Sequence, residues 1–162
     1  MSVSHTSAHH RAERRSARLA AVQALYQMEL TGTDAETVAQ EFFDHRFQNE
    51  TAPADAKLFH DIVAGVPRRQ AEVDTAIASC LTKEWRLQRI DSILRAVLRA
   101  AAFELMGQED VPARVVIDEY IEITRCFAGD TECGFVNAVL DQLAHLHRTA
   151  EFGGAGADEQ IK

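Results

Sequence analysis

The chain is poor in residues that break helices or cross-link chains, and it has no long apolar run. Its 162 residues include three prolines, three cysteines, two tyrosines and one tryptophan. No apolar stretch approaches the roughly 18 residues that predict a membrane span, and the polar start lacks the apolar centre of a secretory signal. We therefore expect a cytoplasmic protein without a membrane segment.

The chain also lacks the usual signatures of metal sites and enzymes. Cys80, Cys126 and Cys133 are odd in number and match neither a CxxC pair nor a zinc-ligand spacing, which predicts buried, reduced thiols. We find no glycine-rich phosphate loop, no supported Ser/His/Asp arrangement and no HExxH motif. These absences predict a non-catalytic protein with no cofactor and no metal.

The apolar residues that are present recur at helical spacing almost throughout the chain. Hydrophobic residues make up 46% and charged residues 26% of the sequence, which is typical of one globular domain. The fold class is therefore predicted to be all-α, a compact bundle of six or seven helices. We expect a flexible N-terminal arm over residues 1–10, a helical domain over 11–150 and a disordered tail over 151–162.

Capping residues, glycines and prolines place the helix boundaries. The first helix is predicted from Ala8 to Leu30, and the second after an N-cap at Thr33 or Asp34. The third is predicted from Pro53, with an interruption at Pro67. The central core helix follows Asp91, the next helix runs from Pro112 to Gly129, and the last ends at about Arg148. Leu94, Val97, Leu98, Ala101 and Leu105 mark the central helix as the most apolar one.

Positive charge is concentrated at the start of an acidic chain. The net charge is −8, whereas residues 1–18 carry four arginines and one acid, so this segment is +3 and the rest is −11. Arg11, Arg14, Arg15 and Arg18 lie at i, i+3, i+4 and i+7, so they share one side of the first helix. An exposed row of guanidinium groups suits phosphate oxygens, while a solvated helical face is the alternative.

Two further arginines lie on the predicted central helix. Arg95 and Arg99 are four residues apart, and Glu104, Glu119 and Glu122 are available as acidic partners. We expect them to make structural ion pairs rather than to bind a ligand.

Three stretches of the chain resemble the NusB family, from about Arg11 to Arg148. They are RAERRSARLAAVQALYQME near the start, LRAVLRAAAFELMGQEDVPARVVIDEYIEI in the centre and FAGDTECGFVNAVLD near the end. Each stretch is weak alone, but the three occur in the family's order and spacing. Leu94, Gly134 and Ala138 depart from the family pattern.

The resemblance implies two helical subdomains and an RNA-binding adaptor of transcription antitermination. Such a protein binds the single-stranded boxA element of nascent RNA, ribosomal RNA included, together with NusE, a small-subunit ribosomal protein, in an antitermination complex with RNA polymerase. Carried over by position, the RNA-binding residues are Arg11, Arg14, Arg15, Arg18, Arg125 and Phe135. Tyr26 is carried over as the contact with the protein partner.

Other functions remain open from the sequence. NusB-like domains also form the front of some ribosomal-RNA cytosine methyltransferases, but the methyl-donor loop of the catalytic part is missing here. A purely structural helical dimer or a DNA-binding regulator is the third reading, although the basic stripe is not on the second helix of a helix-turn-helix. Monomer and homodimer are both open. For stacking on RNA bases, Phe135 and Tyr26 are the exposed aromatic candidates.

Overall fold

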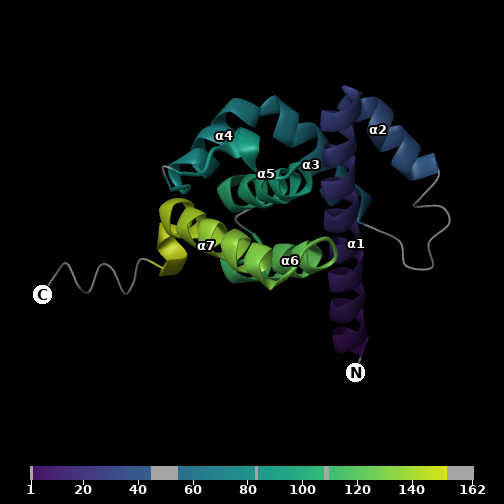
Figure 1. Cartoon of the computed structure of the whole chain (residues 1–162). Coiled ribbons are helices and arrows are strands. Elements are labelled where there is room, and N and C mark those ends of the chain that lie inside the picture. Colours follow the sequence, from purple (N-terminus) through teal and green to yellow (C-terminus); the bar gives the residue numbers. More distant parts are fainter. Residues whose placement is uncertain (1, 45–54, 83, 108–109, 153–162) are drawn as a thin grey trace, which may run out of the picture. The chain divides into compact units, whose positions relative to one another are not determined.

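The computed structural model describes residues 2–44, 55–82, 84–107 and 110–152, with side chains from residue 8 onward. In these ranges every regular element is a helix, which confirms the all-α class (Figure 1). The elements are α1 (Ser2–Thr31), α2 (Ala35–Phe42), α3 (Ala56–Arg68), α4 (Gln70–Ser79), the 3-10 helix η2 (Leu87–Arg89), α5 (Ser92–Gly107), α6 (Ala113–Arg125) and α7 (Asp130–His147). No helix among them is long and apolar enough to cross a membrane.

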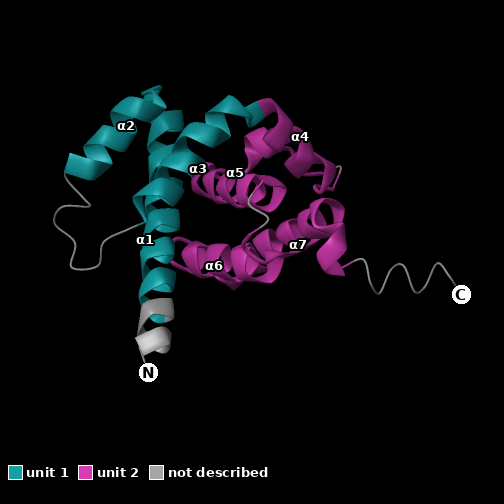
Figure 2. Ribbon diagram, turned by 180° about the vertical axis from the view of Figure 1, so that it is seen from behind, with its two compact units in different colours: residues 1–70 teal, residues 71–162 magenta. Residues whose placement is uncertain are grey.

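The chain divides into two compact units (Figure 2). Unit 1 comprises residues 1–70 and unit 2 comprises residues 71–162. Two helical units agree with the two subdomains that the resemblance implied.

In unit 1, α2 and α3 pack against each other and against the long helix α1. The Phe59 ring is buried and lies against the rings of Phe42 and Phe43, with centroid distances of 5.5 and 5.9 Å. The Gln27 side chain donates a hydrogen bond of 3.0 Å to Glu41, which adds a polar link between α1 and α2. An aromatic cluster and a polar link therefore hold the short helix α2.

The start of α1 differs from the sequence prediction. The helix already includes Ser2, whereas we expected it to begin near Ala8 after a loose arm over residues 1–10. No glycine or proline precedes Gly32, so the sequence holds no local stop signal for the helix at its N-terminal side. The end is as predicted, because Gly32 adopts a left-handed φ of 70° directly after Thr31.

The other boundaries in unit 1 follow local signals. The Asp34 carboxylate accepts a hydrogen bond from the Thr37 amide and caps α2, so Asp34 is the cap of the two predicted candidates, Thr33 and Asp34. Asp55 caps α3 in the same way through the Leu58 amide. The predicted start of α3 at Pro53 lies outside the described residues. Helix α3 ends at Arg68, directly after Pro67, so the predicted interruption is confirmed.

Unit 2 is built around α5, which packs against α6 and α7. The five apolar residues that marked it as the core helix are all buried, and Asp91 caps its start through the Ile93 amide. Arg99 forms a two-pronged ion pair with Asp74 of α4, with N–O distances of 2.8 and 3.0 Å. The structural ion pair predicted for Arg99 is therefore present, with a partner that the sequence analysis had not considered.

Arg148, with 4% of its surface exposed, ties the end of α7 to the end of α5 and to the segment before α6. Its Nε and Nη2 atoms donate to the carbonyls of Leu105 and Glu104 in the last turn of α5, at 2.7 and 3.0 Å. Its Nη1 atom donates to the carbonyl of Val111, just before α6, at 2.9 Å. Helix termini leave carbonyl groups without partners, and this one guanidinium satisfies several of them.

Glu151 completes this arrangement, which we call the Arg148–Glu151 clip. One carboxylate oxygen accepts from Arg148 at 2.7 Å and the other accepts from the Ala113 amide, at the start of α6, at 2.8 Å. Residues 151 and 152 are helical, although the sequence placed them in the disordered tail. The rest of that predicted tail, residues 153–162, lies outside the described part of the chain.

The three cysteines do not share one environment. Cys80 and Cys133 are buried, as expected, and burial raises the pKa of the Cys80 thiol. Cys126 is exposed, so the expectation of burial is wrong there. It follows the last residue of α6, where the helix turns away toward α7.

We predict that Arg148→Ala lowers the free energy of unfolding by about 3 kcal/mol, because several buried carbonyls lose a charged donor. Urea unfolding followed by circular dichroism measures this loss. Arg114→Ala is the matched control, since Arg114 is an exposed arginine of α6 and should change stability by less than about 0.5 kcal/mol. Equal unfolding midpoints for the two variants would show that the clip has no role in stability.

The clip should also depend on pH. The hydrogen bond from the Ala113 amide, followed by that from Arg148, lowers the pKa of Glu151. A lowered carboxyl pKa adds stability that is complete above the ordinary value of 4.5 and is lost as pH falls through the lower folded-state pKa. We expect wild-type protein to be more stable than Glu151→Gln at neutral pH, with a difference that shrinks in acid. A difference independent of pH would contradict this.

Candidate nucleic-acid interface

Three of the four predicted arginines form an exposed row on α1. Arg11, Arg14 and Arg15 are exposed, and their spacing places them on one side of the helix. Arg11 and Arg14 make no ion pair with another described residue. Glu13 lies about 200° around the helix from Arg11 and faces His9 and His10, at 3.7 and 3.8 Å. Arg11 and Arg14 therefore present cationic groups on a side of the helix that does not carry Glu13.

Arg18 does not belong to this exposed row. Only 2% of its surface is exposed, so the expectation of four exposed arginines is wrong at this position. Ala21 and Val22, one turn further along the same side of the helix, are also buried, so this side of α1 enters the core at Arg18. Arg18 has an interaction partner, and no buried side-chain nitrogen or oxygen of the described residues lacks a hydrogen-bond partner. A buried guanidinium is tolerated because its donors are satisfied.

Tyr26 lies two helical turns beyond Arg18 on α1. Its side chain is half-buried, and its hydroxyl group makes no hydrogen bond with another described residue. Leu30, one turn further along, has 60% of its surface exposed. A half-buried ring with a polar tip beside an exposed leucine is typical of a protein-binding surface.

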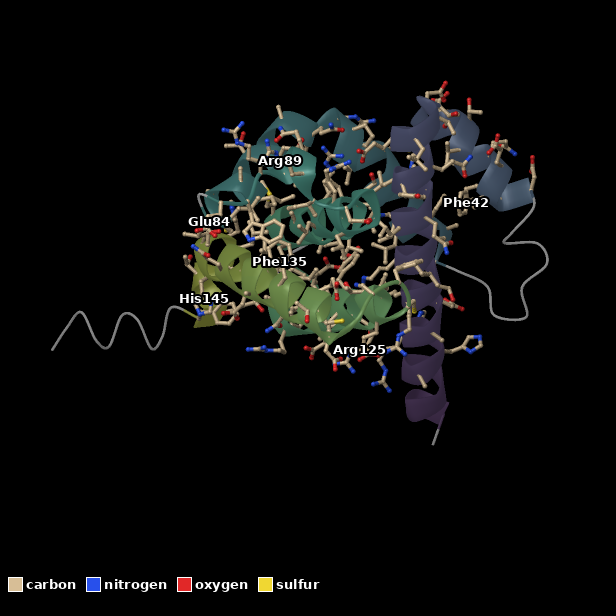
Figure 3. The ribbon with its side chains drawn as sticks, viewed as in Figure 1. Phe42, Glu84, Arg89, Arg125, Phe135 and His145 are labelled. Carbon is tan, nitrogen blue, oxygen red and sulfur yellow. The ribbon has the colours of Figure 1, made fainter. Side chains whose placement is uncertain are left out.

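The remaining two predicted residues belong to unit 2. Arg125, in the last turn of α6, is exposed and lies 3.6 Å from the exposed carboxylate of Glu122, a pairing that contributes little in water. Phe135 is half-buried on α7. Figure 3 shows the two side chains on separate parts of unit 2, so they do not form one local cluster.

Trp85 is a surface aromatic residue that the sequence analysis missed. It has 51% of its surface exposed, and its ring lies 5.5 Å from that of Phe135 at an interplanar angle of 39°. Its place before a short turn was visible in the sequence, but its packing against a residue of α7 was not. The exposed aromatic surface near Phe135 therefore consists of two rings.

Arg95 shapes the segment that carries Trp85. Its Nη1 atom donates to the carbonyls of Leu87, Gln88 and Ile90 at 3.1, 3.3 and 2.7 Å, and its Nη2 atom donates to the Ser92 hydroxyl at 3.2 Å. An ion pair was expected for Arg95, whereas these acceptors are main-chain carbonyls and a hydroxyl group. Because the carbonyls of η2 converge on one buried guanidinium, the segment after Trp85 has a defined conformation.

The chain belongs to the NusB family, whose sequence model matches residues 15–145. It is 51% identical over 144 residues to the transcription antitermination protein NusB of Nitrobacter winogradskyi, covering 86% of this chain and 89% of that protein. It is 50% identical over 144 residues to the protein of the same name from Maricaulis maris, covering 86% and 90%.

Solved structures agree with this assignment. T. maritima NusB superposes with a TM-score of 0.72 at 31% identity, covering 83% of this chain and 92% of that one. A complex of the antitermination factors NusB and NusE with double-stranded RNA contains a similar chain, with a TM-score of 0.69, 22% identity and coverage of 82% and 96%. At that identity the second comparison shows the fold alone.

We predict that Phe135→Ala shifts the fluorescence emission of Trp85 to longer wavelength, because the indole loses a neighbouring ring and gains contact with water. Trp85 is the chain's single tryptophan, so its emission reports this site alone. Arg125→Ala, an exposed substitution in the same unit, should leave the emission unchanged. An unchanged spectrum for Phe135→Ala would mean that the two rings do not pack in solution.

Proposed function

We propose that this chain is a non-catalytic, RNA-binding adaptor of transcription antitermination. It binds the boxA element of nascent RNA together with NusE and acts with RNA polymerase in the cytoplasm. The observation that carries this proposal is the exposed row of Arg11, Arg14 and Arg15 on α1 of an otherwise acidic protein.

The arginine row suits phosphate oxygens for a chemical reason. A guanidinium group offers a planar fork of donors that matches a phosphate, and it is less strongly hydrated than an ammonium group. The net charge of −8 opposes RNA binding over most of the surface, so phosphate contacts are favoured only where positive charge is concentrated, as in the N-terminal segment. The protein alone should therefore bind RNA with modest affinity.

A second, basic protein supplies the positive surface that RNA needs beyond the arginine row. RNA that extends beyond the arginines meets an acidic surface and needs a basic partner beside it. We propose that NusE is this partner and that Tyr26, with Leu30 one turn away, belongs to the surface that it contacts. The names of the relatives and the occurrence of NusB with NusE in a solved complex support this choice.

We predict that Arg11→Ala/Arg14→Ala weakens binding of a single-stranded boxA RNA about tenfold or more, because two charge-assisted contacts are lost. Arg68→Ala/Arg114→Ala is the matched control, since it removes the same charge from exposed positions on α3 and α6. Fluorescence anisotropy at fixed salt measures both affinities. Equal weakening in the two variants would show that only net charge matters and would refute the assigned row.

The salt dependence gives a separate test of the same contact. The slope of log affinity against log salt should be about −0.7 per phosphate contacted, so roughly −2 for three arginines. In the double variant this slope should become shallower by about 1.4 because two phosphate contacts are gone. A slope near zero for the wild-type protein would exclude a phosphate contact.

We predict that Tyr26→Asp reduces NusE binding more than it reduces RNA binding by the isolated chain, because it places a charge in the proposed protein interface. Leu30→Asp should act in the same direction, and its exposed position keeps the fold intact. Leu146→Asp is the control, since Leu146 is 55% exposed on α7. Calorimetry with NusE decides the question: normal NusE binding by a folded Leu30→Asp variant would contradict the proposed surface.

A further inference from the structure

We infer that Trp85 and Phe135 together form a stacking platform for a base of single-stranded RNA. This platform is a binding site in unit 2 additional to the arginine row of α1. It rests on the proposed RNA-binding function and extends it to Trp85, a residue that the resemblance did not assign a role.

The contact between the two rings leaves about half of the Trp85 surface exposed. The two centroids are 5.5 Å apart at 39°, so each ring supports the other, while 51% of the Trp85 surface remains in contact with water. Stacking of bases on exposed aromatic rings is a principal source of affinity for single strands, and it tolerates any base because every base has a π-face. An indole held by a second ring offers such a surface.

The platform is pre-organised by the segment that follows Trp85. Leu87 and Ile90 are buried, and their carbonyls are bound by the buried guanidinium of Arg95. The Trp85 amide also donates to the Thr82 carbonyl at 3.0 Å. Because the backbone is held on both sides, a base binds without the cost of ordering a loop.

The charge around Trp85 favours a phosphate chain. Arg86 and Arg89 are exposed and make no ion pair with another described residue, and Glu84 is the one acid in residues 84–90. This segment is therefore +1 in a protein whose net charge is −8. Figure 3 shows Arg89, Glu84 and Phe135 in this region of unit 2.

These features favour a single-stranded nucleic acid over an apolar peptide or an RNA duplex. An apolar peptide needs a broader hydrophobic surface. Trp85 is instead flanked in the sequence by two charged residues, Glu84 and Arg86. In a duplex the faces of the bases are already stacked on one another, so they are not free to contact a protein ring.

The test uses the full chain and a single-stranded RNA of about ten nucleotides that contains the boxA sequence, with binding followed by anisotropy of an end label. We expect Trp85→Ala to weaken binding by about fivefold or more, whereas Trp85→Phe, which keeps a ring, should retain most of the affinity. Leu146→Ala is the matched control, because it truncates an exposed apolar side chain elsewhere in unit 2. RNA should also quench the fluorescence of Trp85 in the wild-type protein.

Equal RNA affinity of Trp85→Ala and Leu146→Ala would overturn the platform. Circular dichroism of each variant shows that the comparison is made on folded protein. Failure of the platform is distinct from failure of the proposed function. If wild-type protein binds the RNA and the Arg11→Ala/Arg14→Ala variant weakens it while Trp85→Ala does not, only the platform is wrong. If wild-type protein does not bind the RNA, the proposed function is wrong.

Discussion

The need to satisfy buried guanidinium groups organises much of this structure. A charged arginine loses its water on burial, and the fold is stable only when carbonyls or carboxylates replace that water. Arg148 donates hydrogen bonds to three main-chain carbonyls and to the Glu151 carboxylate. These bonds join the end of α5, the start of α6 and the segment after α7. The carbonyls and the carboxylate that satisfy this one charge therefore also link α5, α6 and α7.

The same constraint acts on Arg95 and has a consequence for the surface. Three carbonyls between α4 and α5 accept hydrogen bonds from this guanidinium, and the side chains of Gln88 and Arg89 in the same segment are exposed. Trp85 then meets Phe135 at the edge of this ordered turn. The buried charge of Arg95 thus holds the backbone of the segment that follows Trp85.

Burial also separates arginines that look equivalent along α1. Arg11, Arg14, Arg15 and Arg18 share one helical side, yet Arg18 is buried while the other three are exposed. The apolar stretch from Ala20 to Leu25 takes this helix into the core, and Arg18 lies at the point where the surface ends. The charge available for phosphate is therefore smaller than the sequence indicates, and this agrees with an adaptor that relies on a partner.

The sequence by itself determined the all-α class, the core face of α5, the cap at Asp91, the cap of α2 to within Thr33 or Asp34, and the interruption at Pro67. These features depend on residues within one or two turns of each other, so periodicity and capping chemistry are enough to predict them. Three features needed the tertiary structure: the burial of Arg18, the carbonyl acceptors of Arg95 and the contact between Trp85 and Phe135. Trp85 and Phe135 are fifty residues apart in the chain, and no local pattern indicates which ring will meet which. Whether an arginine stays in water or is buried likewise depends on how helices pack, because packing decides which acceptors can replace its water.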